Sequence, residues 1–302
     1  MMSKLRNISL LLLGLALSVP VFAQTDLLFS QHGMNQRVFN PAAIIDNGML
    51  NMELMGRQQW IGFPDAPSVQ YVGADLFMEQ QPMGLKFGFL NQIAGKEITR
   101  QLGVSYAYQV RFSQVLSAQF GLSAGFYQRQ VRFSELIFEE GNEPLIKPDE
   151  SVLKPDFSFG FELYWKDFTL GMAANHVTTP HRKATIFKIP IHNHFYLMHR
   201  FILENEIQLF SGISWHQQGS INRFQLDVQF NFGQWEAGLA YRNQDALILK
   251  AGIALSASIR MNYAYDFGIS KIANYNSGTH EISLQFNFAR RSGTYLSPRF
   301  LD

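Results

Sequence analysis

Strict alternation of apolar and polar residues runs through most of the chain after residue 48. The clearest stretch is residues 261–288, which divides into two arms separated by turn-forming residues at 271–279. In both arms every second residue is apolar: Met261, Tyr263, Tyr265, Phe267, Ile282, Leu284, Phe286 and Phe288. A period of two places all of these side chains on one face of a strand. The pattern predicts a β-hairpin with one long aromatic face.

The same alternation recurs in about fourteen segments of suitable length for a tilted membrane crossing by a strand. We expect strands near residues 49–60, 68–79, 83–92, 99–112, 115–130, 156–165, 168–177, 192–201, 204–216, 222–232, 234–242, 246–254, 257–270 and 280–288. This pattern predicts an all-β fold, a transmembrane antiparallel β-barrel of about 14 strands.

The connections between these segments support a membrane barrel. Those after even-numbered strands are short, as at residues 113–114 and 166–167, whereas residues 132–155, 178–191 and 271–279 form longer ones after odd-numbered strands. Outer-membrane barrels have short periplasmic turns and longer outer loops. We therefore expect an outer-membrane barrel with both mature termini in the periplasm.

Four tryptophans fit the same arrangement. Trp60 and Trp215 fall at the predicted outer strand ends, and Trp165 and Trp235 at the periplasmic ends. Aromatic residues gather at both membrane interfaces of such barrels.

The first 23 residues predict a cleaved signal peptide. Lys4 and Arg6 precede an apolar run at residues 8–17, and Ala23 ends a cleavage site. The run is shorter than the roughly 20 residues that a spanning helix needs. The expected divisions are therefore a signal peptide (1–23), a periplasmic or lumenal lead-in segment (24–47), the barrel (48–288) and a C-terminal tail (289–302).

Composition is consistent with a barrel and excludes other classes. Aromatic residues make up 14% and charged residues 16%, with a mean hydropathy near zero. This balance suits strands that face lipid on one side and a polar lumen on the other. Without Lys4 and Arg6 the chain carries 23 basic and 24 acidic residues, so no nucleic-acid partner is indicated. The absence of cysteine excludes disulfides and thiolate chemistry.

Charged residues of both signs are predicted to face the barrel interior. The acidic residues are Glu53, Glu162, Asp227, Glu236, Asp266 and Glu281, and the basic residues are Arg57, Lys86, Arg111, Lys250 and Arg260. This near balance favours ion pairs across a filled lumen, whereas an ion-selective pore would favour one sign. We expect a plug supplied by residues 24–47, the tail or a long loop.

Three motifs resemble the PorP/SprF family of outer-membrane proteins associated with the type IX secretion system. The first is Phe29-Ser-Gln-His followed by Phe39-Asn-Pro-Ala, which contains Asn40 and Pro41. The second is Arg57-Gln-Gln-Trp-Ile-Gly-Phe-Pro, which contains Trp60, and the third is the closing hairpin with Asp266, His280 and Glu281. The resemblance covers essentially the whole mature chain. After Asn-Pro-Ala this chain reads Ala43-Ile-Ile-Asp, where the family pattern has Tyr-Ala-Gly.

The resemblance implies a non-enzymatic barrel that assists type IX secretion, of the gliding-motility type, or anchors a secreted cargo at the cell surface. The implied partners are the C-terminal domain of that cargo, secretion components, and outer-membrane lipid with lipopolysaccharide. The barrel itself would be monomeric within a hetero-complex. The motif residues Asn40, Pro41, Arg57, Trp60, Asp266, His280 and Glu281 are the implied family-motif or lumenal-network positions. The alternative is a passive porin-like channel.

Chemistry is not indicated by the residues themselves, so no catalytic, cofactor-binding or metal site is predicted. Ser283, His280 and Asp266 form the only grouping that resembles a nucleophile, a base and an orienting acid. His192 and His194 share a strand face, with His176, His181 and His199 nearby in sequence, but neither a cysteine nor a close acidic residue completes a metal site. We interpret them as histidines of a solvated rim.

Overall fold

The structure, a computed structural model, describes residues 29–33, 35–45, 49–78, 81–135, 148–177 and 189–289. The predicted signal peptide and residues 290–302 of the predicted tail lie outside these ranges, so they stay predictions.

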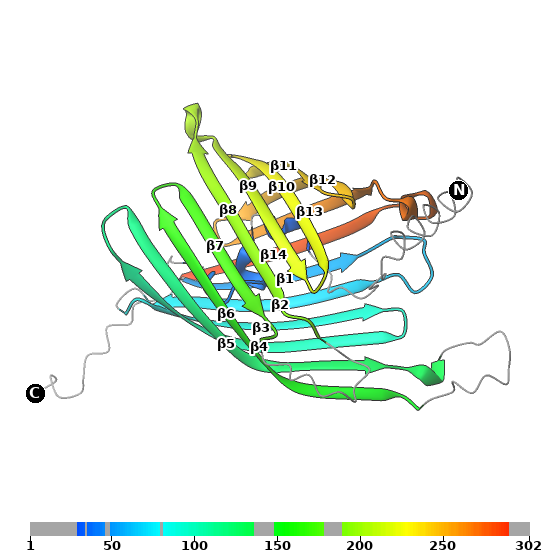
Figure 1. The fold of residues 1–302 in the computed structure, drawn as a ribbon. Coiled ribbons are helices and arrows are strands. Elements are labelled where there is room, and N and C mark those ends of the chain that lie inside the picture. Colours follow the sequence, from blue (N-terminus) through cyan, green and yellow to red (C-terminus); the bar gives the residue numbers. More distant parts are fainter. Residues whose placement is uncertain are drawn as a thin grey trace, which may run out of the picture.

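Fourteen antiparallel strands form a closed barrel, which confirms the fold class and the strand count (Figure 1). Each strand pairs with its neighbours in sequence, and β1 closes the barrel by pairing with β14. The strands are β1 Met49–Gln58, β2 Ser68–Met78, β3 Met83–Ala94, β4 Glu97–Arg111, β5 Leu116–Val131, β6 Glu150–Trp165, β7 Phe168–Asn175, β8 His192–Ile202, β9 Gln208–Gln218, β10 Ile221–Phe232, β11 Trp235–Arg242, β12 Ala246–Ser256, β13 Ile259–Gly268 and β14 Thr279–Ala289.

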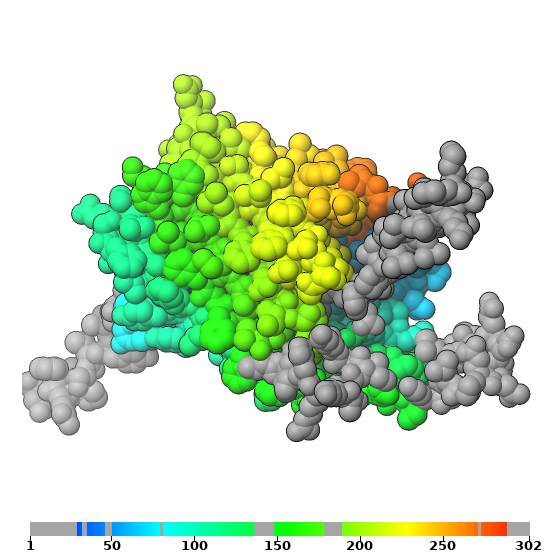
Figure 2. Space-filling model, in the orientation of Figure 1, coloured from blue at the N-terminus to red at the C-terminus, as the bar shows by residue number. Residues whose placement is uncertain are grey.

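The outer wall is apolar and aromatic, as the alternation predicts. On β10, for example, Phe224, Leu226 and Val228 are 47%, 52% and 42% exposed, whereas Gln225 and Asp227 between them are buried. Figure 2 shows the outer wall over the green to yellow strands as a continuous surface. Large apolar side chains exposed all round a closed barrel are the surface that lipid covers in membrane barrels.

The two sets of connections lie at opposite ends of the barrel (Figure 1). We call the end with the turns after even-numbered strands the short-turn mouth. The other, with residues 59–67, 132–149, 176–191 and 269–278, is the long-loop mouth. In the second of these connections, residues 132–149, Asp149 accepts hydrogen bonds from the backbone N–H and the hydroxyl of Ser134, at 3.0 and 2.8 Å. These bonds lower the pKa of the exposed Asp149 carboxyl and join the two described ends of the 132–149 connection.

Two predicted strand boundaries are wrong. β6 begins at Glu150, so Pro155 lies within the strand and not in the preceding loop. Between Glu150 and Ser158 this strand pairs with β5 but not with β7, whose pairing begins at Phe159, so a residue without an N–H is tolerated there. β9 begins at Gln208 because residues 204–206 form a 3-10 turn.

Polar side chains on the outer wall mark the membrane boundary near the long-loop mouth. Asn91 donates to Gln70 at 2.6 Å between β3 and β2, and Asn193 donates to Gln217 at 3.0 Å between β8 and β9. On the membrane side of these pairs the outward residues are apolar, such as Phe89 and Phe195. Among the described residues, no helix has the length and apolar character needed to cross a membrane.

Candidate functional site: a plugged lumen

The described residues 29–33 and 35–45 lie along the inside of the barrel. Phe29, Ser30, Asn40 and Ala42 are each at most 1% exposed, although they belong to neither a strand nor a long helix. Phe29 packs on Met55, Val69 and Tyr71 of the wall. We call residues 29–45 the lumenal segment; it appears in dark blue within the barrel in Figure 1.

A buried charge cluster fixes the start of the lumenal segment. Arg57 of β1 contacts Asp266 of β13 at 2.8 Å and Glu281 of β14 at 3.1 Å. Both carboxylates also accept hydrogen bonds from the lumenal segment: the Ser30 and Gln31 N–H groups donate to Glu281 at 2.6 and 2.9 Å, and the Ser30 hydroxyl donates to Asp266 at 2.7 Å. Buried charges are stable only when they are paired and hydrogen-bonded in this way.

Arg242 of β11 extends the cluster around the barrel. Its guanidinium lies 3.4 Å from Asp266 and 3.0 Å from Asp245, and it donates to Gln225 of β10 at 2.9 Å. Ser30 and its partners therefore join strands β1, β10, β11, β13 and β14.

A second cluster holds the middle of the lumenal segment. Arg37 lies between Glu53 of β1 and Asp75 of β2, at 3.2 and 3.1 Å. Asn35 donates to the same Glu53 at 2.5 Å, and Gln285 of β14 donates to it at 3.0 Å. Arg37 is the cation of the lumenal segment, and its two partners come from the wall.

Asn40 begins a turn that Lys86 of β3 stabilises. The Lys86 ammonium donates to the carbonyl oxygens of Arg37 and Asn40 at 2.8 and 2.6 Å. The Asn40 side chain accepts from the Ala42 N–H at 2.9 Å and donates to the Tyr196 hydroxyl at 2.7 Å, and Tyr196 in turn donates to Glu162. Lys86 thus binds backbone oxygens, whereas the sequence predicts an ion pair across the lumen.

Two glycines of the wall make room for the Asn-Pro-Ala turn. Gly121 of β5 and Gly160 of β6 are directly paired. A Cβ at Gly121 would lie 2.3 Å from the Ala42 nitrogen, and a Cβ at Gly160 would lie 2.0 Å from Asn40 Oδ1. Glycine within a strand often marks a bend of a barrel or a close approach of another backbone, and here the two glycines admit the backbone of the lumenal segment.

The structure brings five of the seven predicted positions into this lumenal arrangement. Arg57, Asp266 and Glu281 form one cluster, and Asn40 lies further along the lumenal segment, followed by Pro41 against Gly121 and Gly160. Their roles as family positions stay predictions.

Trp60 and His280 lie elsewhere. Trp60 follows β1 in a left-handed backbone conformation, with φ of 48°, and its N–H donates to the Thr279 hydroxyl at 3.2 Å. His280 points to the outer wall, where it contacts the Tyr263 hydroxyl at 2.5 Å. Ser283 points inward and donates to Gln31, so Ser283 and His280 are on opposite faces of β14 and do not form a nucleophile and base pair.

Four histidines are buried, which corrects the interpretation of three of them, His176, His192 and His194, as rim residues. His176, His192, His194 and His216 are at most 5% exposed. His176 contacts Asp156 at 2.9 Å, and His194 contacts His216 on the neighbouring strand and stacks on Phe39. No group of three or more histidine, cysteine or acidic residues in the described ranges is arranged to hold a metal ion. His181 falls outside those ranges.

Several residues of the site were not singled out from the sequence. Arg37, Tyr196, Arg242 and Gln225 were missed, although the last three fall on the polar or inward phase of their strands. Alternation reveals that such a residue faces inward, but it does not reveal what it contacts.

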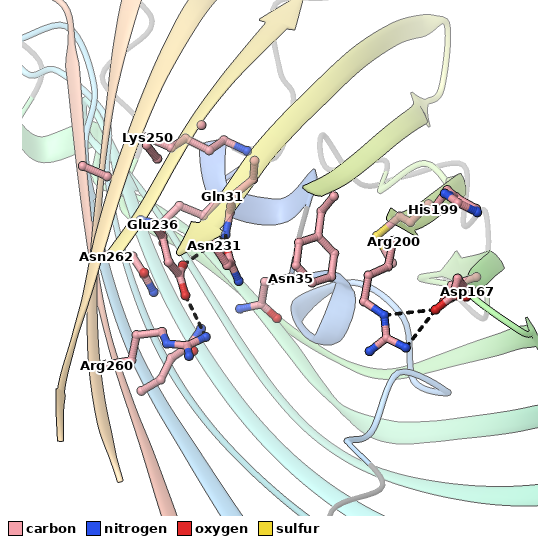
Figure 3. Close-up of a pocket in the computed structure, with 18 of the residues that line it drawn as sticks. Gln31, Asn35, Asp167, His199, Arg200, Asn231, Glu236, Lys250, Arg260 and Asn262 are labelled. Carbon is pink, nitrogen blue, oxygen red and sulfur yellow. Dashed lines mark hydrogen bonds and ion pairs between the residues drawn. The ribbon is translucent and has the colours of Figure 1, made fainter. Parts of the chain in front are cut away.

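A cavity of about 420 Å³ opens near the short-turn mouth, below the lumenal segment (Figure 3). Gln31 and Asn35 line it from the lumenal segment, and amide and charged side chains line it from the wall. Two of its rim cations are paired, Arg260 with Glu236 at 2.8 Å and Arg200 with Asp167 at 2.9 Å. Lys250 and Asp227, two more of the charges predicted to face inward, also form an ion pair. Arg111 donates to Gln109 at 3.0 Å near the same mouth.

Three solved structures of low sequence identity have a similar fold. The chain resembles a Pseudomonas aeruginosa FadL homologue, with a TM-score of 0.51 and 12% identity over 83% of this chain and 92% of that one. It also resembles the CymD monoaromatic hydrocarbon channel, with a TM-score of 0.52 and 13% identity over 87% and 94%. The Ralstonia pickettii toluene transporter TbuX has a TM-score of 0.50 and 11% identity over 85% and 93%. At these identities the likeness establishes the fold alone.

No curated protein matches the sequence. Residues 21–286 match the family described as type IX secretion system membrane protein PorP/SprF, a range that includes the lumenal segment and nearly all of the barrel. The chain therefore belongs to the PorP/SprF family of type IX secretion system membrane proteins.

Proposed function

We propose that this protein is a sealed outer-membrane barrel that holds a secreted cargo for the type IX secretion system, and not a pore or an enzyme. The observation that carries the proposal is the lumenal segment, whose charged and backbone groups are bonded to at least five strands of the wall. A lumen filled in this way favours a scaffold over a channel.

The long loops provide the natural contact surface for cargo. Long loops on a rigid scaffold often carry recognition, and residues 132–149 and 176–191 are the longest connections of this chain. In the orientation that we propose, the long-loop mouth faces the cell exterior and the short-turn mouth faces the periplasm, as in other outer-membrane barrels. Ala289, at the end of β14, then faces the periplasm. Lipid and lipopolysaccharide surround the outer wall, and the barrel is a monomer within a hetero-complex.

Affinity purification from the native outer membrane tests this function. We expect a secreted protein with a C-terminal targeting domain, or a secretion component, to be recovered with the tagged barrel. A matched variant with residues 136–147 replaced by a Gly-Ser linker of equal length should insert normally but recover less cargo. Recovery of neither class of partner with the unaltered barrel would rule out the anchoring role.

A porin-like channel is the second candidate, because the cavity at the short-turn mouth is open to solvent. The hydrocarbon channel and toluene transporter of the same fold also favour a passage through a barrel of this size. Conductance of the purified protein in a planar bilayer separates the two functions.

A further inference from the structure

We infer that the chain passes through its own lumen from the long-loop mouth to the short-turn mouth, so that its mature N-terminus forms part of the long-loop face. This differs from the expectation that both mature termini share the periplasmic side. It is independent of the cargo, and it holds whichever way the barrel faces.

The wall contacts give the direction of the lumenal segment. Its first residues meet strand positions next to the long loops: Ser30 bonds Asp266, two residues before the end of β13, and Glu281, two residues after the start of β14. Phe29 packs on Val69, the second residue of β2, which also lies at that mouth.

The last residues of the lumenal segment meet the opposite mouth. Ile44 packs on Phe77, next to the end of β2, and on Ala107 in the half of β4 that leads to the turn at 112–115. A Cβ at Gly84, the second residue of β3, would lie 2.9 Å from Ile44. β1 then begins at Met49, at the short-turn mouth.

The segment before Phe29 is too short to run back through the barrel to the short-turn mouth. With cleavage after Ala23, five residues precede Phe29, and they span at most about 18 Å when fully extended. The apolar band of an outer-membrane barrel is about 25 Å tall. The path back is also occupied, because Arg37, Asn40 and Ala42 fill the lumen behind Phe29. The contacts of Phe29 and Ser30 therefore direct the N-terminus toward the long-loop mouth.

The absence of cysteine makes a labelling experiment clean. Three variants are compared in cells: Gly-Ser-Cys-Gly-Ser inserted between Gln24 and Thr25, Ser220→Cys in the exposed β9–β10 connection, and Ser258→Cys in the exposed β12–β13 turn. Each is treated with a membrane-impermeant maleimide before and after the outer membrane is permeabilised. Heat-modifiable migration on a gel verifies that each variant is folded.

We expect the inserted cysteine to follow Ser220→Cys, with labelling at least tenfold above that of the cysteine-free chain under the same condition, and to differ from Ser258→Cys. Labelling that follows Ser258→Cys would overturn the inference, as would an inserted cysteine that is protected on both sides. If the insertion prevents folding, the single substitution Thr25→Cys replaces it and the same two outcomes decide.

Discussion

Arg57 illustrates how a single lumenal residue supports the barrel. Its guanidinium is 2% exposed and is the nearest cation to two carboxylates that also bind the lumenal segment. The favourable Coulomb energy offsets a large desolvation cost, so the balance depends on keeping every partner. Removing the cation alone leaves two buried carboxylates without their main counter-charge.

Arg57→Met is expected to lower the free energy of unfolding by about 3–5 kcal/mol, because it breaks a buried ion pair on one side. Urea unfolding of the detergent-solubilised barrel, followed by heat-modifiable migration, measures the change. Arg200→Ala is the matched control, since its pair with Asp167 is 46% and 40% exposed, and we expect about 0–1 kcal/mol there. Equal losses in the two variants would contradict the proposed role of the cluster.

Gly121 tests how the wall accommodates the Asn-Pro-Ala turn. Gly121→Ala places a Cβ 2.3 Å from the backbone nitrogen of Ala42, which cannot move without displacing the turn, so a loss of about 1–3 kcal/mol is expected. Gly88→Ala is an inward-facing control, because its nearest neighbour, the Tyr71 hydroxyl, lies 3.4 Å away in ordinary contact. The same unfolding measurement applies, and a stable Gly121→Ala with an unstable Gly88→Ala would refute the packing argument.

At the scale of elements, β14 combines the two faces of the barrel most clearly. Phe286 and Phe288 stack on the outer wall with ring centroids 6.3 Å apart, while Glu281 and Ser283 bind the lumenal segment on the inner one. The strand also closes the barrel by pairing with β1 over ten residue pairs from Met49 to Gln58. A substitution on either face of β14 is therefore expected to weaken the pairing of β1 with β14 that closes the barrel.

The double variant Phe286→Arg with Phe288→Arg is expected to block membrane insertion. Each arginine on the lipid face costs about 2–4 kcal/mol at the bilayer midplane and about 0–1 near the interface. Asn287→Arg is the control, because Asn287 lies between them on the lumenal face and should tolerate the charge. Outer-membrane fractionation gives the result, and normal recovery of the double variant in a heat-modifiable form would disprove the lipid-facing assignment.

At the scale of the whole molecule, the lumenal segment occupies the interior of the fourteen-stranded barrel. Barrels of this size lie between those filled by side chains and those that leave an aqueous channel, so their permeability depends on what occupies the lumen. Here the occupant comes from the same chain and bonds to strands on both sides of the β1–β14 seam.

The purified protein is therefore expected to show no stable large conductance in a planar bilayer. Replacing Arg37, Asn40 and Ser30 together with alanine removes three of the side chains that bond the lumenal segment to the wall and is expected to raise the frequency of open events. Arg200→Ala, at the rim of the short-turn mouth, serves as the control for charge removal. A stable open pore in the unaltered protein would support the channel function instead.

Alternation along the sequence determined much of the fold, since the face on which a strand side chain lies follows from local geometry alone. It predicted fourteen strands, the lipid-facing residues of β10 and β14, the long and short connections, and the inward direction of Arg57, Asp266 and Glu281. It predicted that Lys86 faces inward and forms an ion pair, whereas Lys86 binds backbone carbonyl oxygens, because the partners of a side chain cannot be read from local sequence. It also predicted that Pro155 lies in a loop, because the sequence does not show where the pairing of β6 with β7 begins.

What only the tertiary structure decided is how distant parts of the chain meet inside the barrel. Ser30 and Glu281 are 251 residues apart, and the contact of Asn40 with Tyr196 spans 156. No periodicity specifies such pairs, because the lumenal segment has no regular repeat and its bonds form only once the wall encloses it. The sequence by itself therefore determined the wall, and the closed barrel decided the course and the partners of the segment that fills it.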